Sequence, residues 1–204
     1  MLKLYYLPGA CSIVPHVALE WARAEYEGEA ATRELIKSPE YLALNPQGAV
    51  PLLQDGSWTL SQNAAIIDYI NDVYPEAKLF GTGDVKHIAK SRQWLAFVNA
   101  DVHKAFVPLF SPARFIEGEA EQAQLRAVAA ERIITLLAQP NDVLVQQDYL
   151  NGGLSIADVY LYVILRWAKG FSLDLSNLPA LEGFYTRVES NTGVQSVLKQ
   201  QGLL

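Results

Sequence analysis

The sequence predicts an α/β domain followed by an all-helical domain. Strand and helix signals alternate over residues 1–78, a short stretch rich in glycine and proline follows, and beyond residue 85 apolar residues recur only at helical spacing. We therefore expect a first domain at residues 1–78, a linker at 79–85 and a helical domain at 86–204.

The beginning of the chain predicts a β-α-β unit. The apolar run Lys3–Leu7 is typical of a short buried strand, and the amphipathic stretch Ser12–Ala24 is typical of a helix. Tyr26–Thr32 is a weaker strand candidate. A crossover helix in this position joins two parallel strands of one sheet.

A hairpin and a further helix follow after a long connection. The connection ends in the turn cluster Asn45-Pro46-Gln47-Gly48, and Asp55-Gly56 then separates the two short apolar runs Val50–Gln54 and Trp58–Leu60. Asp-Gly between two such runs is a hairpin signal, so we expect an antiparallel edge to the sheet. Ser61 can cap the helix that comes next.

The second part of the chain predicts only helices. One long helix is expected from about Lys86 to Leu109. Ser155 and Asp158 resemble a capping box in which Asp replaces the usual Glu or Gln. The stretch Val159–Ala168 is apolar nearly all round, so this helix should lie in the centre of the domain.

Composition narrows the class of protein. The 204 residues carry a net charge of −6, so we expect no nucleic-acid partner and no attraction to an anionic membrane. No apolar run approaches the roughly 18 residues of a membrane span, and the N-terminus does not look like a signal peptide. The single cysteine fits a reducing compartment, and with three scattered histidines we expect no metal site. These features together predict a cytoplasmic protein.

Cys11 is the first candidate functional residue. It follows the turn Pro8-Gly9-Ala10 and precedes the first helix. The positive end of a helix favours a thiolate, whether of the cysteine itself or of a ligand. Burial as a small apolar side chain is the alternative for a cysteine of this kind. Ser12 adds a hydroxyl at the same point.

Two further segments of the first half could hold a ligand. Proline at a strand start after a glycine turn is a candidate cis bond, so Val50–Pro51 could leave the Val50 backbone to pair with an extended ligand. Gln62 and Asn63 open the next helix, where N–H groups can bind a carboxylate. A peptide-like ligand with a thiol, an amide and a terminal carboxylate would match all three segments.

Five stretches of the chain, taken together and in this order, carry a resemblance to a known family. They are Leu4–Ser12 with Pro15-His16, Tyr41–Leu53, Ser61–Ile66, Val102–Phe106 and Ser155–Asp158. In these stretches the chain resembles the cytosolic glutathione S-transferases over its whole length, most closely their bacterial beta class. The resemblance implies a thioredoxin-like glutathione-binding domain followed by an all-helical domain. It also implies a homodimeric detoxification enzyme that uses glutathione and no metal.

The resemblance assigns roles to several positions of the first domain. Cys11 matches the residue beside the glutathione sulfur, and Tyr6 matches a tyrosine that other classes use to activate the thiol. Val50 matches the residue whose backbone pairs with the cysteinyl part of glutathione, and Pro51 matches the cis-proline. Lys37 is the candidate for the glycyl carboxylate.

Further positions extend this set. Gln62 and Asn63 match the pair that binds the γ-glutamyl end, but they replace the acidic-plus-small pair that is common there. His103 and Lys104 match helical-domain residues near the thiol and the glycyl end. Ala96 stands where relatives place an asparagine that reaches across the dimer.

The activity follows from these assignments, with alternatives. We expect a glutathione S-transferase that conjugates glutathione to hydrophobic electrophiles through a stabilised thiolate, with Cys11, Ser12 and His103 in catalytic positions. Thiol–disulfide exchange through Cys11 is an alternative, and a non-catalytic regulatory protein of the same fold is another. The sequence does not identify the electrophile. We expect His16 and His87 at the surface or in caps.

Overall fold

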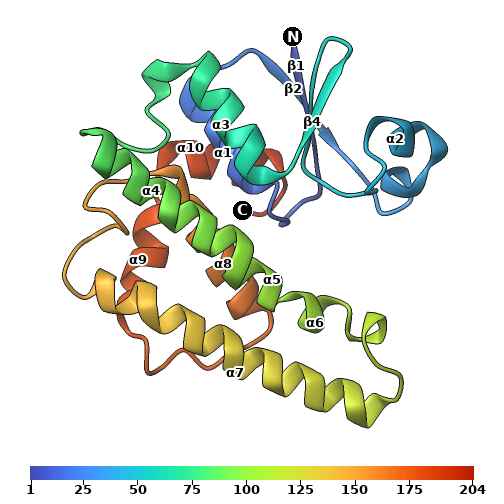
Figure 1. Ribbon diagram of the computed structural model, residues 1–204, viewed down its shortest axis with the longest axis vertical. Coiled ribbons are helices and arrows are strands. Elements are labelled where there is room, and N and C mark those ends of the chain that lie inside the picture. The colour runs from blue at the N-terminus through green and yellow to red at the C-terminus, as the bar shows by residue number, and fades with distance from the viewer. The chain divides into compact units, whose positions relative to one another are not determined.

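The computed structural model describes residues 1–204, which form two compact units (Figure 1). The first unit comprises Met1–Gly81 and Glu189–Leu204, and the second comprises Thr82–Val188. The last segment belongs to the first unit because helix α10 (Thr192–Gln200) packs on helix α1 (Ile13–Ala22). The domain limits that the sequence predicts, 1–78 and 86–204, stay a prediction.

A four-stranded mixed sheet forms the centre of the first unit. Its order is β2-β1-β3-β4, with β1 and β2 parallel and the other neighbours antiparallel. This confirms the β-α-β unit and the hairpin that the sequence predicts. The strands are β1 (Leu2–Tyr6), β2 (Tyr26–Ala30), β3 (Leu52–Asp55) and β4 (Trp58–Ser61).

Helices cover both faces of this sheet. Helices α1 and α3 (Asn63–Val73) lie together on one side, and α2 (Pro39–Leu44) lies on the other (Figure 1). Side chains of a strand alternate between its faces, and Tyr5 accordingly packs beside Tyr41 of α2, with ring centres 5.5 Å apart. The sequence predicts only a connection in this region. The helix is only 6 residues long and starts at Pro39, behind a Ser38 cap.

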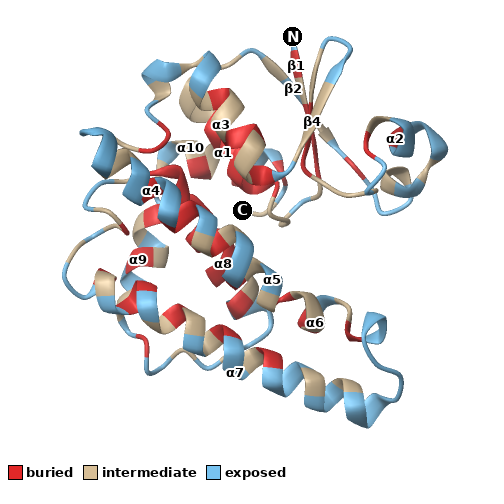
Figure 2. Ribbon diagram, in the orientation of Figure 1, coloured by how far each residue is buried: buried red, intermediate tan, exposed pale blue.

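The second unit is entirely helical, as the sequence predicts, so the fold class is confirmed. Helix α8 (Ile156–Gly170) is buried along almost its whole length and forms the core. The long helix α7 (Glu119–Leu144) shows buried and exposed residues in alternation along its length (Figure 2). The remaining helices are α4 (Val85–Phe97), α5 (His103–Ala105), α6 (Val107–Phe110) and α9 (Ala180–Glu189).

The single long helix expected at 86–109 is interrupted. Val98–Val102 form a π-helical segment between α4 and α5, and α6 begins anew at Val107, followed by Pro108. Proline lacks the N–H that would continue the ladder, whereas it is tolerated in the first turn of a new helix. No helix of the molecule is both long enough and apolar enough to cross a bilayer.

The predicted capping box is confirmed at the start of α8. The Ser155 N–H and the Ser155 hydroxyl both donate to Asp158 Oδ2, each at 2.8 Å. Asp158 Oδ1 accepts a further bond from the N–H of Leu150 at 2.8 Å. One buried carboxylate thus joins the central helix to the chain segment that leads into it.

Candidate functional site

The Cys11 thiol lies at the N-terminus of α1. Cys11 is half-buried and directly precedes the cap residue Ser12, and its Sγ lies 3.9 Å from the carbonyl oxygen of Val50. The first-turn amides of Ile13 and Val14 donate to Ala10 O and Cys11 O. The backbone N–H of Ser12 makes no hydrogen bond within the chain. A ligand thiolate at this point would meet one amide donor and the positive end of the helix.

Ser12 has a different place from the one expected. Its side chain is fully buried, and its hydroxyl donates to Leu7 O and accepts from Leu7 N, both at 3.2 Å. The hydroxyl therefore closes the loop between β1 and α1, and its proton is directed into the protein. This corrects the expectation that the Ser12 hydroxyl points toward a ligand.

His16 holds the same loop from behind. It is fully buried, not at the surface as expected, and burial lowers its pKa. Its Nδ1 accepts from Gln201 Nε2 at 3.1 Å, and Gln201 Oε1 accepts from Gly9 N at 3.1 Å. Its Nε2 donates to Gln200 Oε1 at 3.1 Å. The C-terminal segment is thereby hydrogen-bonded to the loop that carries Cys11.

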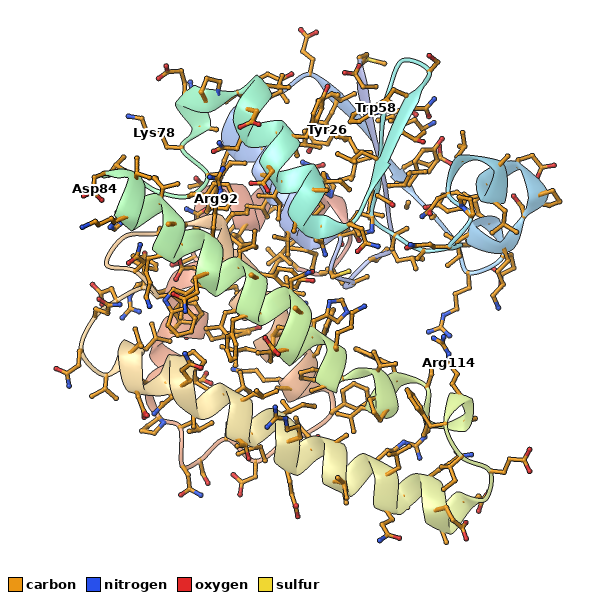
Figure 3. The ribbon with its side chains drawn as sticks, viewed as in Figure 1. Tyr26, Trp58, Lys78, Asp84, Arg92 and Arg114 are labelled. Atoms are coloured by element: carbon orange, nitrogen blue, oxygen red, sulfur yellow. The ribbon has the colours of Figure 1, made fainter.

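Two tyrosines enclose the His16 ring. Tyr6 lies 4.9 Å from it and Tyr26, labelled in Figure 3, lies 5.4 Å from it, measured between ring centres. Tyr6 is only 6% exposed, so it is a core residue of the first unit. Its contribution to ligand binding stays a prediction. Sequence reasoning missed the network because its members are up to 192 positions apart.

The segment before Val50 is held in one backbone conformation. The Val50–Pro51 bond is cis, as predicted. The carbonyl of Ala49 accepts two bonds, from the Tyr41 hydroxyl at 2.8 Å and from Asn45 Nδ2 at 2.7 Å. The sequence marks Asn45 only as part of a turn cluster and gives neither donor a role in the site. The half-buried Val50 is thus presented from a fixed loop.

Gln62 and Asn63 lie at the start of α3, as the sequence predicts. Gln62 is exposed and has a φ of 77°, which is uncommon for a residue other than glycine. Its Nε2 donates to Gln47 Oε1 at 3.1 Å, which ties the start of α3 to the loop before Val50. Asn63 is only 4% exposed. Lys37 is an exposed residue at the end of the short 3-10 helix Leu35–Lys37.

His103 and Lys104 belong to the second unit. His103 is half-buried and its Nδ1 lies 2.7 Å from the Tyr160 hydroxyl, whereas Lys104 is exposed. Burial, and to a smaller extent the charge of Lys104, lowers the pKa of His103 to about 4. The imidazole is therefore neutral at pH 7.

An aromatic cluster surrounds Trp167 in the same unit. Its ring centre lies 4.8 Å from that of His103, 5.6 Å from that of Phe106 and 5.1 Å from that of Phe110. Phe171 adds a fourth ring, 5.2 Å from Phe110. Phe110 is 49% exposed and Phe171 is 37% exposed, so the cluster presents aromatic surface to solvent.

Comparison with known proteins identifies two family domains in this chain. A family model described as the glutathione S-transferase N-terminal domain matches residues 1–72, and one described as the C-terminal domain matches residues 97–191. A glutathione S-transferase of Xanthomonas campestris, named GST-4.5, is 40% identical and covers 99% of this chain and 100% of its own length.

Solved structures give the same result. The glutathione S-transferase from Xylella fastidiosa superposes with a TM-score of 0.95 at 42% identity, with both chains fully covered. A bacterial beta class enzyme from Sphingomonas chungbukensis superposes with a TM-score of 0.86 at 31% identity, over 99% of this chain and 100% of the other. The chain belongs to the glutathione S-transferase family.

Proposed function

We propose that this protein is a glutathione transferase that conjugates glutathione to hydrophobic electrophiles. The observation that carries the proposal is the position of the Cys11 thiol, at the N-terminus of α1 and 3.9 Å from the Val50 carbonyl oxygen. A peptide-like ligand that pairs with the Val50 backbone would place its own sulfur beside Cys11. Membership in the glutathione S-transferase family supports glutathione as that ligand.

In this proposal, different residues of the first unit bind different parts of glutathione. Val50, fixed by the bonds to Ala49 O, pairs with the cysteinyl part, and Pro51 shapes this edge. Gln62 and Asn63 receive the γ-glutamyl end at the first turn of α3. Lys37 binds the glycyl carboxylate. Ser12 supplies its backbone N–H to the thiolate, while its hydroxyl holds the loop.

The second unit supplies the electrophile site in this proposal. The aromatic cluster around Trp167 favours flat, aromatic electrophiles because exposed rings of Phe110 and Phe171 can stack on them. His103 contacts the glutathione thiol, and Lys104 contacts the glycyl end. Both assignments rest on the resemblance of Val102–Phe106 to the family.

The proposal also covers the cellular compartment and the oligomeric state. We infer a detoxification enzyme of the cytoplasm, since a single cysteine suits a reducing compartment. We infer a homodimer formed through residues 86–109, a segment that carries more apolar residues than one packed face requires. Sedimentation at micromolar concentration should give twice the monomer mass of 22.6 kDa. Monomer alone would contradict the dimer.

Thiol–disulfide exchange is a second candidate, favoured by the half-buried Cys11 thiol at the N-terminus of α1. The Cys11 thiolate would attack the glutathione sulfur of a mixed disulfide, and the other thiol would leave as a thiolate. A second glutathione would then attack the Cys11–glutathione disulfide, releasing oxidised glutathione and restoring Cys11. A single cysteine suffices for this cycle.

The variant Cys11→Ala separates the two activities. Conjugation to an aryl chloride should stay within about tenfold of wild type, since at most one hydrogen bond of about 1.4 kcal/mol is lost. Reduction of a glutathione mixed disulfide should fall to background, because no other thiol can attack sulfur. Both assays are run on protein that is still retained by immobilised glutathione.

Each result has a definite meaning. Disulfide reduction that survives in Cys11→Ala would exclude Cys11 as the redox nucleophile. Conjugation that collapses in a folded, glutathione-binding variant would exclude activation by the amide and helix terminus alone. Val128→Ala, a change of an exposed side chain on α7, is the control and should leave both rates unchanged.

A further inference from the structure

Three side chains of the second unit form a hydrogen-bonded chain that ends on His103. His103 Nδ1 lies 2.7 Å from the Tyr160 hydroxyl oxygen, and that hydroxyl donates to Asn99 Oδ1 at 2.9 Å. Tyr160 is fully buried in the central helix α8. Asn99 and His103 lie four positions apart on the opposing helical segment, so both reach the same hydroxyl.

The direction of the protons in this chain follows from its far end. The amide oxygen of Asn99 can only accept, so the one proton of the Tyr160 hydroxyl is used there. The Tyr160 oxygen must then accept from His103, which requires a proton on Nδ1. A neutral imidazole carries one proton, so its Nε2 has a lone pair.

The ring of His103 is held in this orientation. It packs against the Trp167 ring at 4.8 Å between centres, and a 180° flip would break the 2.7 Å bond to Tyr160. With a pKa of about 4, His103 carries no second proton at neutral pH. The imidazole is thus neutral, and the bond to Tyr160 places its one proton on Nδ1.

We propose that Asn99 and Tyr160 are positioning residues that fix His103 as the Nδ1–H tautomer, so that Nε2 is a hydrogen-bond acceptor. The consequence for the reaction rests on the proposed function. An acceptor at the glutathione sulfur binds the neutral thiol through its S–H and offers no proton to the thiolate. His103 therefore orients the thiol, and the thiolate is stabilised by groups of the first unit.

The tautomer can be measured directly, without glutathione. Two-bond ¹H–¹⁵N correlation spectra of ¹⁵N-histidine protein distinguish a protonated ring nitrogen from one with a lone pair. Wild type should show His103 protonated at Nδ1 only. In Asn99→Leu the Tyr160 proton is released to point at Nδ1, and in Tyr160→Phe the partner is lost, so both variants should shift to Nε2–H.

Two more variants separate positioning from general structural damage. Asn99→Asp keeps an acceptor at the end of the chain and should retain the wild-type tautomer. Tyr162→Phe removes another fully buried tyrosine hydroxyl of α8, one that accepts from Arg166 and not from His103. It should leave the tautomer unchanged. A wild-type His103 protonated at Nε2, or an unchanged tautomer in both Asn99→Leu and Tyr160→Phe, would overturn the proposal.

The thiol of bound glutathione gives a second readout, by its thiolate absorbance against pH. In Asn99→Leu and Tyr160→Phe an Nε2–H donor would replace the acceptor, and the thiol pKa should fall by about one unit. Asn99→Asp and Tyr162→Phe should match wild type. A shifted tautomer with an unshifted thiol would refute the assignment of His103 to the thiol and so overturn the consequence, while the positioning itself would stand.

Discussion

Replacement of Asp158 by alanine should destabilise the protein much more than the loss of an ordinary helix cap. The carboxylate accepts three hydrogen bonds of 2.8 Å, from Leu150 N, Ser155 N and the Ser155 hydroxyl. All three residues are at most 2% exposed. Alanine would leave two buried backbone N–H groups without acceptors, at about 1–3 kcal/mol each. We expect a loss of about 3 kcal/mol, against about 1 kcal/mol for a typical cap.

The measurement is urea unfolding at pH 7.5, followed by tryptophan fluorescence. Asp174→Ala is the matched control, because Asp174 also accepts a backbone N–H, that of Ser176 at 3.0 Å, but lies in an exposed loop. Its loss should be much smaller. Equal midpoints for wild type and Asp158→Ala would refute the idea that this carboxylate anchors the central helix.

The pH dependence of the same variant has a defined sign. Burial raises the pKa of Asp158 from 3.8 to about 6. The folded state therefore holds this proton more tightly than the unfolded state, and the resulting stability is lost as pH rises through 6. The difference between wild type and Asp158→Ala should be about 1 kcal/mol larger at pH 5 than at pH 7.5.

Two further predictions concern the first unit. Gly48→Ala should lower the free energy of unfolding by about 2 kcal/mol and weaken retention on immobilised glutathione. The reason is that φ is 57° and a Cβ would lie 2.8 Å from the carbonyl oxygen of Ile36. Unchanged unfolding and retention would contradict the fixed loop before Val50. His16→Leu should speed amide hydrogen exchange in α10, since its bonds to the C-terminal segment are lost. Because burial lowers the His16 pKa, wild type should also lose stability as pH falls through 6.5, and the variant should lose less; identical pH curves would show that His16 does not contribute.

The order of elements could be predicted because each signal is local. Asp55-Gly56 sets the hairpin through its own backbone preferences, and Gly56 indeed has a φ of 59°. The apolar run from Val159 predicted a central helix, and the pair Ser155 and Asp158 predicted its cap. In each case the residues that carry the signal are within a few positions of the structure that they determine.

The side-chain environments could not be predicted in the same way. His16 is buried because the C-terminal segment, far along the chain, supplies both of its hydrogen-bond partners, Gln200 at the end of α10 and Gln201 after it. The Ser12 hydroxyl turns to Leu7 because a loop of this length brings that peptide group within 3.2 Å. Neither contact has a local sequence signal. Similarly, the neutral state of His103 depends on its burial against α8, which the helix pattern alone does not specify.

These environments leave few groups that can stabilise a thiolate. The Ser12 hydroxyl donates to Leu7, the Nδ1 proton of His103 is used on Tyr160, and the amides of Ile13 and Val14 are bonded within the turn. The Ser12 N–H and the α1 terminus remain. A hydrogen bond to a charged group contributes about 1.5–3 kcal/mol and a helix end about 0.3–1 kcal/mol, together about one to three pKa units. A thiol of pKa near 8.5 would then ionise substantially at neutral pH. In the proposed function one amide and one helix end are therefore sufficient, and this is why conjugation should persist in Cys11→Ala while disulfide reduction should not.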